Sequence, residues 1–158
     1  MNRMWMILPL GICLWGCAPE ETLETVEDEW LQPVMAVPGS LSLQLPETAE
    51  PVLETDTEQM YLQEDSEILV QTLSSGDLGK TISTICGYDR ENLTILNTFT
   101  DGVERYEFVW ASAGEQGERL GRAVILDDGN YHYCLSVVRD AQSDGDAWQD
   151  LFRSFSLV

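Results

Sequence analysis

Hydrophobic and polar residues alternate along much of the chain after about residue 40, and this pattern predicts a succession of strands. Residues 41–45 (Leu-Ser-Leu-Gln-Leu) are typical of a strand, which Pro46 ends. Residues 47–58 are acidic and contain no basic side chain, so we expect a loop there. The apolar triplets 60–62 and 68–70 flank a polar stretch, and this arrangement predicts a hairpin.

A helix is predicted next, because apolar side chains recur at helical spacing after a group of capping residues. The stretch 74–77 (Ser-Ser-Gly-Asp) offers an N-cap, and Gly87 supplies the stop. Since Cys86 belongs to the apolar stripe, we expect its sulfur to face inward. The stripe consists of Leu78, Ile82, Ile85 and Cys86.

The clearest element is a hairpin of two strands, 93–100 and 103–110, joined by the two-residue turn Asp101-Gly102. The large apolar groups then fall on one face, which supports this register. The turn sets the cross-strand pairs Leu93–Trp110, Ile95–Phe108 and Asn97–Tyr106.

A second hairpin is predicted over 120–126 and 131–138, with Asp128-Gly129 as its turn. Both of its faces are largely apolar, so we expect other elements to cover each side. On one face the turn pairs Leu126 with Tyr131, Val124 with Tyr133, Arg122 with Leu135 and Leu120 with Val137. On the other face it pairs Ile125 with His132 and Ala123 with Cys134.

The chain ends with a predicted helix, for which Asp146 and Gln149 form a start similar to a capping box. Its apolar face recurs at i, i+3, i+4 and i+7 and consists of Trp148, Leu151, Phe152 and Phe155. The order strand, hairpin, helix, two hairpins, helix defines an α+β fold. We expect a mostly antiparallel β-sheet of hairpins with two helices packed on it.

This element order, with a closing helix that runs into Phe152-Arg153-Ser154-Phe155, resembles the PsbP-like α/β/α sandwiches of small bacterial lipoproteins. The resemblance spans about residues 41–158. It implies a non-catalytic accessory or assembly domain. No photosystem role and no binding residue are carried over from it.

The N-terminus differs from the rest: one positive charge at Arg3 precedes an apolar run, 6–15, that leads into Leu14-Trp15-Gly16-Cys17. This segment resembles a bacterial lipoprotein signal. Leu14, Gly16 and Cys17 match the lipobox, and Trp15 departs from it, since a small or β-branched residue is usual there. The resemblance implies that residues 1–16 are a signal peptide and that Cys17 becomes a multiply acylated N-terminus, with palmitate as an expected chain. Several acyl chains give stable anchoring where one does not.

Two other interpretations of this segment stay open. A plain secretory signal cleaved near Gly16 or Ala18 has the same charge and length pattern. An uncleaved anchor is disfavoured, because the apolar run has about 10 residues and a membrane-spanning helix needs about 20.

Acidic residues dominate the composition: 28 Asp and Glu stand against 8 Lys and Arg, for a formal net charge of −20. Such a charge opposes binding to nucleic acid, whose affinity for proteins comes mainly from neutralised phosphates. Residues 17–40 are acidic and interrupted by prolines, so they predict a flexible tether, whose first residue, Cys17, would carry the lipid that the resemblance implies. About 140 residues follow the signal, enough for one domain, which we place at 41–158.

Two cysteines, Cys86 and Cys134, lie in the predicted domain. An even pair in an exported domain favours a disulfide. One cysteine lies on the inner stripe of a helix and the other on a central strand, so contact between them is reasonable. Two buried free thiols are the alternative, because free cysteine is a common core residue.

The single histidine, His132, shares a strand face with Cys134 and Ser136. A Cys–His nucleophilic pair needs hydrogen-bond reach, whereas residues two apart on a strand lie about 7 Å apart. A zinc site that adds Cys86 has three ligands where structural zinc normally takes four. A packed core histidine is therefore favoured over catalysis or metal binding.

The acidic residues indicate no stronger site. Residues 140–146 are similar to a calcium loop, but the twelfth position, Leu151, is apolar where a bidentate Glu is required. Asp127-Asp128 favours turn chemistry. The remaining candidate acids scatter over both faces of a hairpin: Asp101, Glu104 and Glu107. We therefore assign no catalytic residue, metal or cofactor.

Together these patterns predict a lipid-anchored protein on the extracytoplasmic face of a cell membrane. Its non-catalytic domain would bind another envelope protein or a small ligand. The alternative is a cell-envelope enzyme that uses Cys134 with His132, or carboxylates clustered in a cleft. A pocket that exposes His132 favours the enzyme, and a filled core around His132 favours the binding module.

Overall fold

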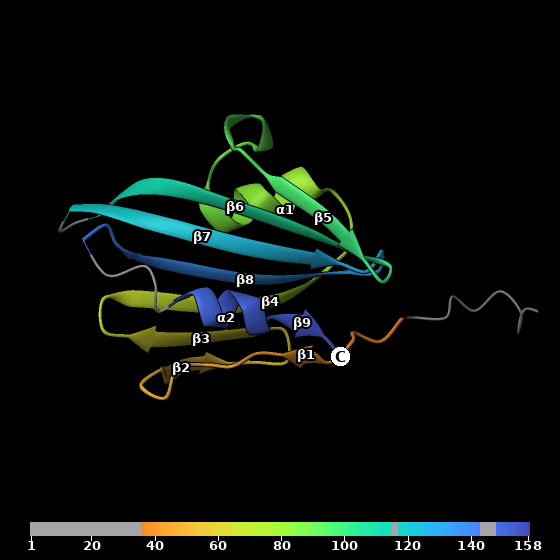
Figure 1. Ribbon diagram of the computed structural model, residues 1–158, viewed down its shortest axis with the longest axis horizontal. Coiled ribbons are helices and arrows are strands. Elements are labelled where there is room, and N and C mark those ends of the chain that lie inside the picture. Colours follow the sequence, from red (N-terminus) through yellow and green to blue (C-terminus); the bar gives the residue numbers. More distant parts are fainter. Residues whose placement is uncertain (1–35, 115–116, 143–147) are drawn as a thin grey trace, which may run out of the picture. The chain divides into compact units, whose positions relative to one another are not determined.

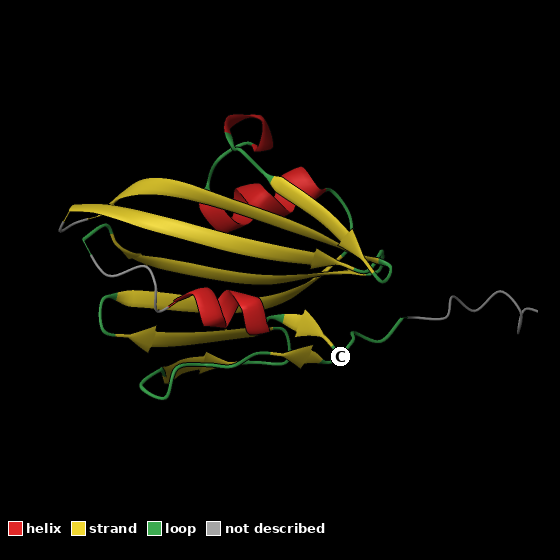
Figure 2. Cartoon of the chain, viewed as in Figure 1, coloured by secondary structure: helices red, strands yellow, loops and turns green. Residues whose placement is uncertain are grey.

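A computed structural model of the chain describes residues 36–114, 117–142 and 148–158. Residues 36–158 form one compact unit, which begins ahead of the predicted domain start at Leu41. Its centre is a seven-stranded antiparallel sheet in the order β2-β3-β4-β8-β7-β6-β5 (Figure 1). Strands predominate and the helices are short (Figure 2). The predicted α+β class is confirmed.

The elements run as follows along the described chain. The large sheet contains β2 (Glu50–Glu54), β3 (Glu58–Gln63), β4 (Ser66–Ser74), β5 (Leu96–Thr100), β6 (Val103–Gly114), β7 (Gly117–Asp127) and β8 (Tyr131–Asp140). A separate two-stranded sheet pairs β1 (Leu41–Ser42) with β9 (Ser156–Leu157). The helical elements are α1 (Leu78–Cys86), the 3-10 turn η2 (Arg90–Asn92) and α2 (Gln149–Ser154).

The loop predicted over residues 47–58 is wrong, because β2 lies within it. This strand is exposed along its whole length and pairs with β3 at the edge of the sheet, with a bulge between Pro51 and Leu53. Neither face of β2 is buried, so its sequence shows no alternation of apolar and polar residues. The strand predicted over 41–45 is confirmed as the shorter β1.

Helix α1 begins and ends where the sequence predicts. The side chain of Asp77 caps its N-terminus by accepting hydrogen bonds from the backbone N–H groups of Gly79 (2.9 Å) and Lys80 (3.3 Å). At the other end Gly87 has a φ of 77°, and its N–H donates to the carbonyl of Ser83 at 2.8 Å.

The first two hairpins also agree with the predictions. Gln63 pairs with Ser66, so β3 and β4 turn over two residues. Strands β5 and β6 turn at Asp101 and Gly102, whose φ angles of 53° and 84° suit a primed turn. The predicted pair Asn97–Tyr106 is present. Strand β5 begins at Leu96, so the predicted pairs Leu93–Trp110 and Ile95–Phe108 lie outside its pairing with β6.

The register predicted for the hairpin of β7 and β8 is wrong by two residues. Val124 pairs with Leu135, and Ile125 pairs with Cys134. The turn centres on Gly129 and Asn130, because Gly129 takes the positive φ of 88° at the first central position. A shift of two residues leaves every side chain on its predicted face.

The apolar cores lie on both faces of the sheet, as predicted. Helix α2 covers one face, where Phe152 packs among the side chains of β4, β7 and β8. Helix α1 covers the other face through Ile82, against side chains of β6, β7 and β8. The molecule is therefore layered as helix, sheet, helix. The α2 face buries the whole predicted stripe of the last helix: Trp148, Leu151, Phe152 and Phe155.

Candidate functional site

Several predicted positions fall outside the described residues. These include the signal segment, the acylation residue Cys17 and most of the tether. They also include Asp146 of the predicted capping box and much of the calcium-like stretch 140–146. None of the helices in the described ranges is long and apolar enough to cross a membrane. Within the same ranges, no group of three or more His, Cys, Asp or Glu is arranged to hold a metal ion.

The two domain cysteines are free thiols in this structure, so the disulfide alternative is not formed. Both belong to the core on the α1 face. The half-buried thiol of Cys86 donates to the carbonyl of Ile82 at 3.1 Å. The Cys134 side chain is 1% exposed, and burial raises the pKa of its thiol to about 12. Since the thiolate is the reactive form, Cys134 is a weak nucleophile at neutral pH.

Thiol labelling tests this assignment. We expect denatured protein without reductant to react at both Cys86 and Cys134. Folded protein should react at Cys86 well before Cys134, because only the first has exposed surface. Mass spectrometry of the labelled peptides measures both reactions. Protection of both thiols in denatured, unreduced protein would contradict the free-thiol assignment.

His132 lies at the beginning of β8 beneath α1 and is 0% exposed. Its Nδ1 and the Oγ1 of Thr81 are 2.9 Å apart in a hydrogen bond that joins α1 to the sheet. Its Nε2 lies 3.3 Å from Oδ2 of Asp127, the residue opposite it on β7, but has no hydrogen-bond partner among the described residues. His132 is therefore a packed core histidine, as the sequence predicts.

Thr81, His132 and Asp127 align a hydroxyl, an imidazole and a carboxylate. Such a row can activate a hydroxyl nucleophile when a substrate can reach it. Thr81 is also buried, so no substrate reaches this hydroxyl in the observed conformation. The hydrogen bond between Thr81 and His132 therefore acts here as a buried polar link between α1 and the sheet.

The candidate acids are dispersed, as the hairpin pattern predicts. The β-sheet register puts Glu107 on the α2 face opposite Val124, and Glu104 on the α1 face opposite Asp127. Asp127 and Asp128 organise the turn between β7 and β8. Oδ1 of Asp127 accepts from the N–H of Gly129 at 2.8 Å. Oδ1 of Asp128 accepts from the backbone N–H groups of Asn130 and Tyr131, both at 2.8 Å.

A charged network ties α2 to the sheet. The guanidinium of Arg105 donates to the carbonyls of Phe152 (2.9 Å) and Phe155 (3.0 Å) at the C-terminal end of α2. A cation there complements the helix dipole. Glu107 accepts from Arg105 Nε at 2.7 Å and from Arg122 at 3.1 Å. The guanidinium carbon of Arg122 also lies 4.4 Å from the centre of the Phe152 ring.

The two arginines of this network lower the pKa of Glu107. Burial favours the neutral carboxyl, but hydrogen bonds from Arg105 and Arg122 and their charges outweigh it, so the pKa of Glu107 lies below its usual value. In an unfolded chain the pKa of a glutamate is about 4.3. As the pH falls, the unfolded chain therefore takes up this proton first. The stabilisation is complete above the usual pKa and is lost as the pH falls through the lowered folded pKa.

Unfolding in urea at several pH values tests this linkage. We expect wild-type protein to lose more stability between about pH 5 and pH 3 than the Glu107→Gln variant, which cannot titrate at this position. Glu50→Gln, on the exposed strand β2, is the control and should follow the wild type. Equal slopes for wild type and Glu107→Gln would contradict the ionised, arginine-bound state of Glu107.

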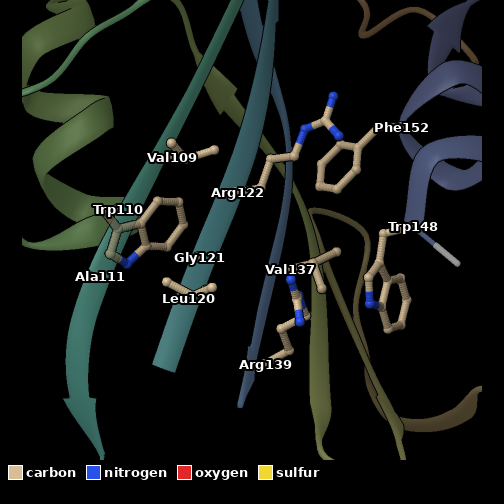
Figure 3. A pocket seen from close by; sticks show the side chains of 10 residues that line it. All are labelled: Val109, Trp110, Ala111, Leu120, Gly121, Arg122, Val137, Arg139, Trp148 and Phe152. Atoms are coloured by element: carbon tan, nitrogen blue, oxygen red, sulfur yellow. The ribbon is translucent and has the colours of Figure 1, made fainter. Parts of the chain in front are cut away.

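A hollow of about 520 Å³ opens beside this network on the α2 face. Figure 3 shows Trp148 and Phe152 on one side of it, and Val109 and Leu120 from β6 and β7 across from them. Its described lining is mostly apolar, with two guanidinium groups, and consists of Val109, Trp110, Ala111, Leu120, Gly121, Arg122, Val137, Arg139, Trp148 and Phe152. This volume falls within the range of small-molecule sites, about 300–1,000 Å³.

Sequence reasoning did not single out this hollow. The sequence does hold one signal of it: Arg122 is a charged residue between the apolar Leu120 and Val124 on one face of β7. The clustering of Arg122 with Arg105 and Arg139 depends on the order of three strands and on the position of α2, which are long-range features.

No protein-family model matches the chain, and no curated protein matches it either. Its function is therefore inferred from the chemistry of its own residues.

Proposed function

We propose that this protein is a lipid-anchored, extracytoplasmic binding module without catalytic activity. Acyl chains on Cys17 hold the domain at the outer side of a cell membrane, and the acidic tether separates the two. The domain binds a small ligand or another envelope protein through the α2 face. One helix packs on each side of an antiparallel sheet, which supports the PsbP-like resemblance. That resemblance implies a non-catalytic accessory or assembly domain.

One observation carries the choice between a binding module and an enzyme. The two side chains that the enzyme alternative would use, His132 and Cys134, are buried beneath α1 at 0% and 1% exposure. The hollow lies on the other side of the sheet and is walled by apolar and arginine side chains. Apolar walls with a few convergent polar groups are typical of sites that bind a ligand.

Membrane fractionation in a bacterial host tests the anchored part of the proposal. We expect the full chain to sediment with membranes and to be released by detergent. Cys17→Ser should abolish this behaviour, because serine has no thiol for acylation. Cys13→Ser is the matched control, since Cys13 lies in the apolar run that cleavage removes, and it should behave as wild type.

Two results would overturn this proposal. The first is a wild-type chain that stays soluble after export. The second is membrane association that persists unchanged in the Cys17→Ser variant, which would mean that another segment holds the chain at the membrane.

A further inference from the structure

We propose that the hollow beside α2 binds an amphiphile with one anionic head group and an apolar acyl body, with Arg122 holding the head group. This inference rests on the proposed binding function and names its ligand class. The chemistry is shared by a free alkyl carboxylate and by an anionic lipid in a bilayer, and the experiment below separates these two sources.

The distribution of basic residues points to an anion. Of the 8 Lys and Arg in the chain, Arg3 lies outside the described residues, which leaves 7. Four of these 7 line this hollow or an adjoining one of about 440 Å³ that shares Arg122 and Phe152 with it. The described lining of the larger hollow contains no acid, and that of the smaller one contains a single acid, Glu107. The four basic residues are Arg105, Arg122, Arg139 and Arg153.

Four guanidinium groups therefore gather on one face of a chain whose net charge is −20, and one of them, Arg153, also pairs with Asp150 at 2.7 Å. A diffuse acidic field repels anions in general, so an anion that binds here needs direct contact with the guanidinium groups. Guanidinium groups form strong, charge-assisted hydrogen bonds with carboxylates and phosphates, frequently through two parallel N–H groups.

Arg122 is the best placed of the four to receive a head group. The Arg105 guanidinium is engaged at Nε, Nη1 and Nη2 by Glu107 and the end of α2. Arg122 donates to Glu107 through Nη2 alone in the contacts of the described residues, and an arginine carries five N–H donors. Its side chain is 39% exposed, and the Phe152 ring at 4.4 Å holds its plane in position.

The walls suit an apolar body. Val109 is 65% exposed at the rim, and Leu120, Val137 and Trp148 continue the apolar surface toward α2. A short acyl chain on these side chains would remove apolar surface from water, which favours binding. A ligand with both parts would therefore be favoured over one that has only the charge or only the chain.

Calorimetric titration of the full-length Cys17→Ser chain tests the proposal without detergent. We expect decanoate to bind, and decanol, which has the chain without the charge, to bind at least tenfold more weakly. Arg122→Gln should weaken decanoate binding by about 10- to 100-fold, as loss of a charge-assisted hydrogen bond does. Arg119→Gln is the matched control: it removes the same charge from the same strand, but Arg119 pairs with Glu67 and does not line the described wall of this hollow.

A second variant fills the hollow without removing a charge. Ala111 is exposed on β6 and lines the hollow, so Ala111→Trp should occupy the hollow and abolish decanoate binding while the domain stays folded.

Flotation with phosphatidylglycerol and phosphatidylcholine vesicles distinguishes a bilayer lipid from a free amphiphile as the ligand. Binding to the anionic vesicles that depends on Arg122 assigns a bilayer lipid, and binding of decanoate alone assigns a free amphiphile.

Three results would overturn the inference: no binding of decanoate or of anionic vesicles, equal affinity for decanol and decanoate, or wild-type affinity in the Arg122→Gln variant. These failures are distinct from failure of the proposed function. A chain that sediments through Cys17 and ignores decanoate would still be an anchored module, with a different ligand. A soluble wild-type chain that binds decanoate would keep the site and lose the anchor.

Discussion

Replacing Phe152 with alanine should lower the free energy of unfolding by about 3–5 kcal/mol, as loss of a large buried aromatic side chain usually does. Phe152 is 2% exposed and packs within the core on the α2 face. Its ring also stacks against Arg122, and α2 has only six residues, so Phe152 supplies a large share of the apolar contact between this helix and the sheet. The free energy of unfolding of an ordinary domain is about 5–15 kcal/mol, so this single change would remove a large part of it.

Urea unfolding followed by circular dichroism measures this loss. Arg153→Ala is the control, because its side chain is 73% exposed and pairs with Asp150 on the helix surface. Such exposed pairs contribute about 0–1 kcal/mol. A Phe152→Ala variant within about 1 kcal/mol of the wild type would show that α2 is not part of the cooperative core.

Gly121→Ala should destabilise the domain by about 3 kcal/mol, near the upper end of what an overpacked core usually costs. Gly121 lies opposite Trp110 in the sheet, and the indole ring covers it. A methyl group added at Gly121 would lie 2.0 Å from Cε2 of Trp110, with two more ring atoms within 2.5 Å. The indole is buried, so it has little room to move away.

Thermal unfolding compares this variant with Gly76→Ala, where a methyl group would meet nothing within 4 Å. The control should unfold at the wild-type temperature, and Gly121→Ala at a lower one. Shortening the indole in the double variant Gly121→Ala, Trp110→Leu should recover part of the clash energy. An unchanged transition for Gly121→Ala alone would mean that the ring does not occupy this position in solution.

Local signals were sufficient for most of the elements. Asp77 and Gly87 set the ends of α1 through capping and a left-handed φ, and both effects depend on near neighbours in the sequence. The turn Asp101-Gly102 fixed the pairing of β5 with β6 for the same reason. The apolar stripe of α2 was visible because all of it faces one core.

The errors arose where local signals were weak or ambiguous. Strand β2 buries neither face, so no periodicity identified it. In the loop 127–130, two possible turns compete around Gly129, and the preference for Asp-Gly chose the wrong one by two residues. A shift of two residues keeps each side chain on its face, so the prediction of a packed core histidine at His132 was unaffected by this error.

The candidate site was the least predictable part. Arg105 and Glu107 are neighbours on one face of β6, but Arg122 is 15 residues from Glu107 and meets it only because β6 pairs with β7. The hollow depends further on where α2 docks, which is a matter of long-range packing. Conversely, the resemblance to a lipobox rests on three nearby residues, Leu14, Gly16 and Cys17.

The central claim is that acyl chains on Cys17 anchor a non-catalytic binding domain at the membrane. The mass of the N-terminal peptide from membrane-extracted protein tests it most directly. We expect a peptide that begins at Cys17 and is heavier by the mass of several acyl chains, which base hydrolysis of the esters would reduce. An unmodified peptide that begins after residue 17, or one that still begins at Met1, would contradict the claim.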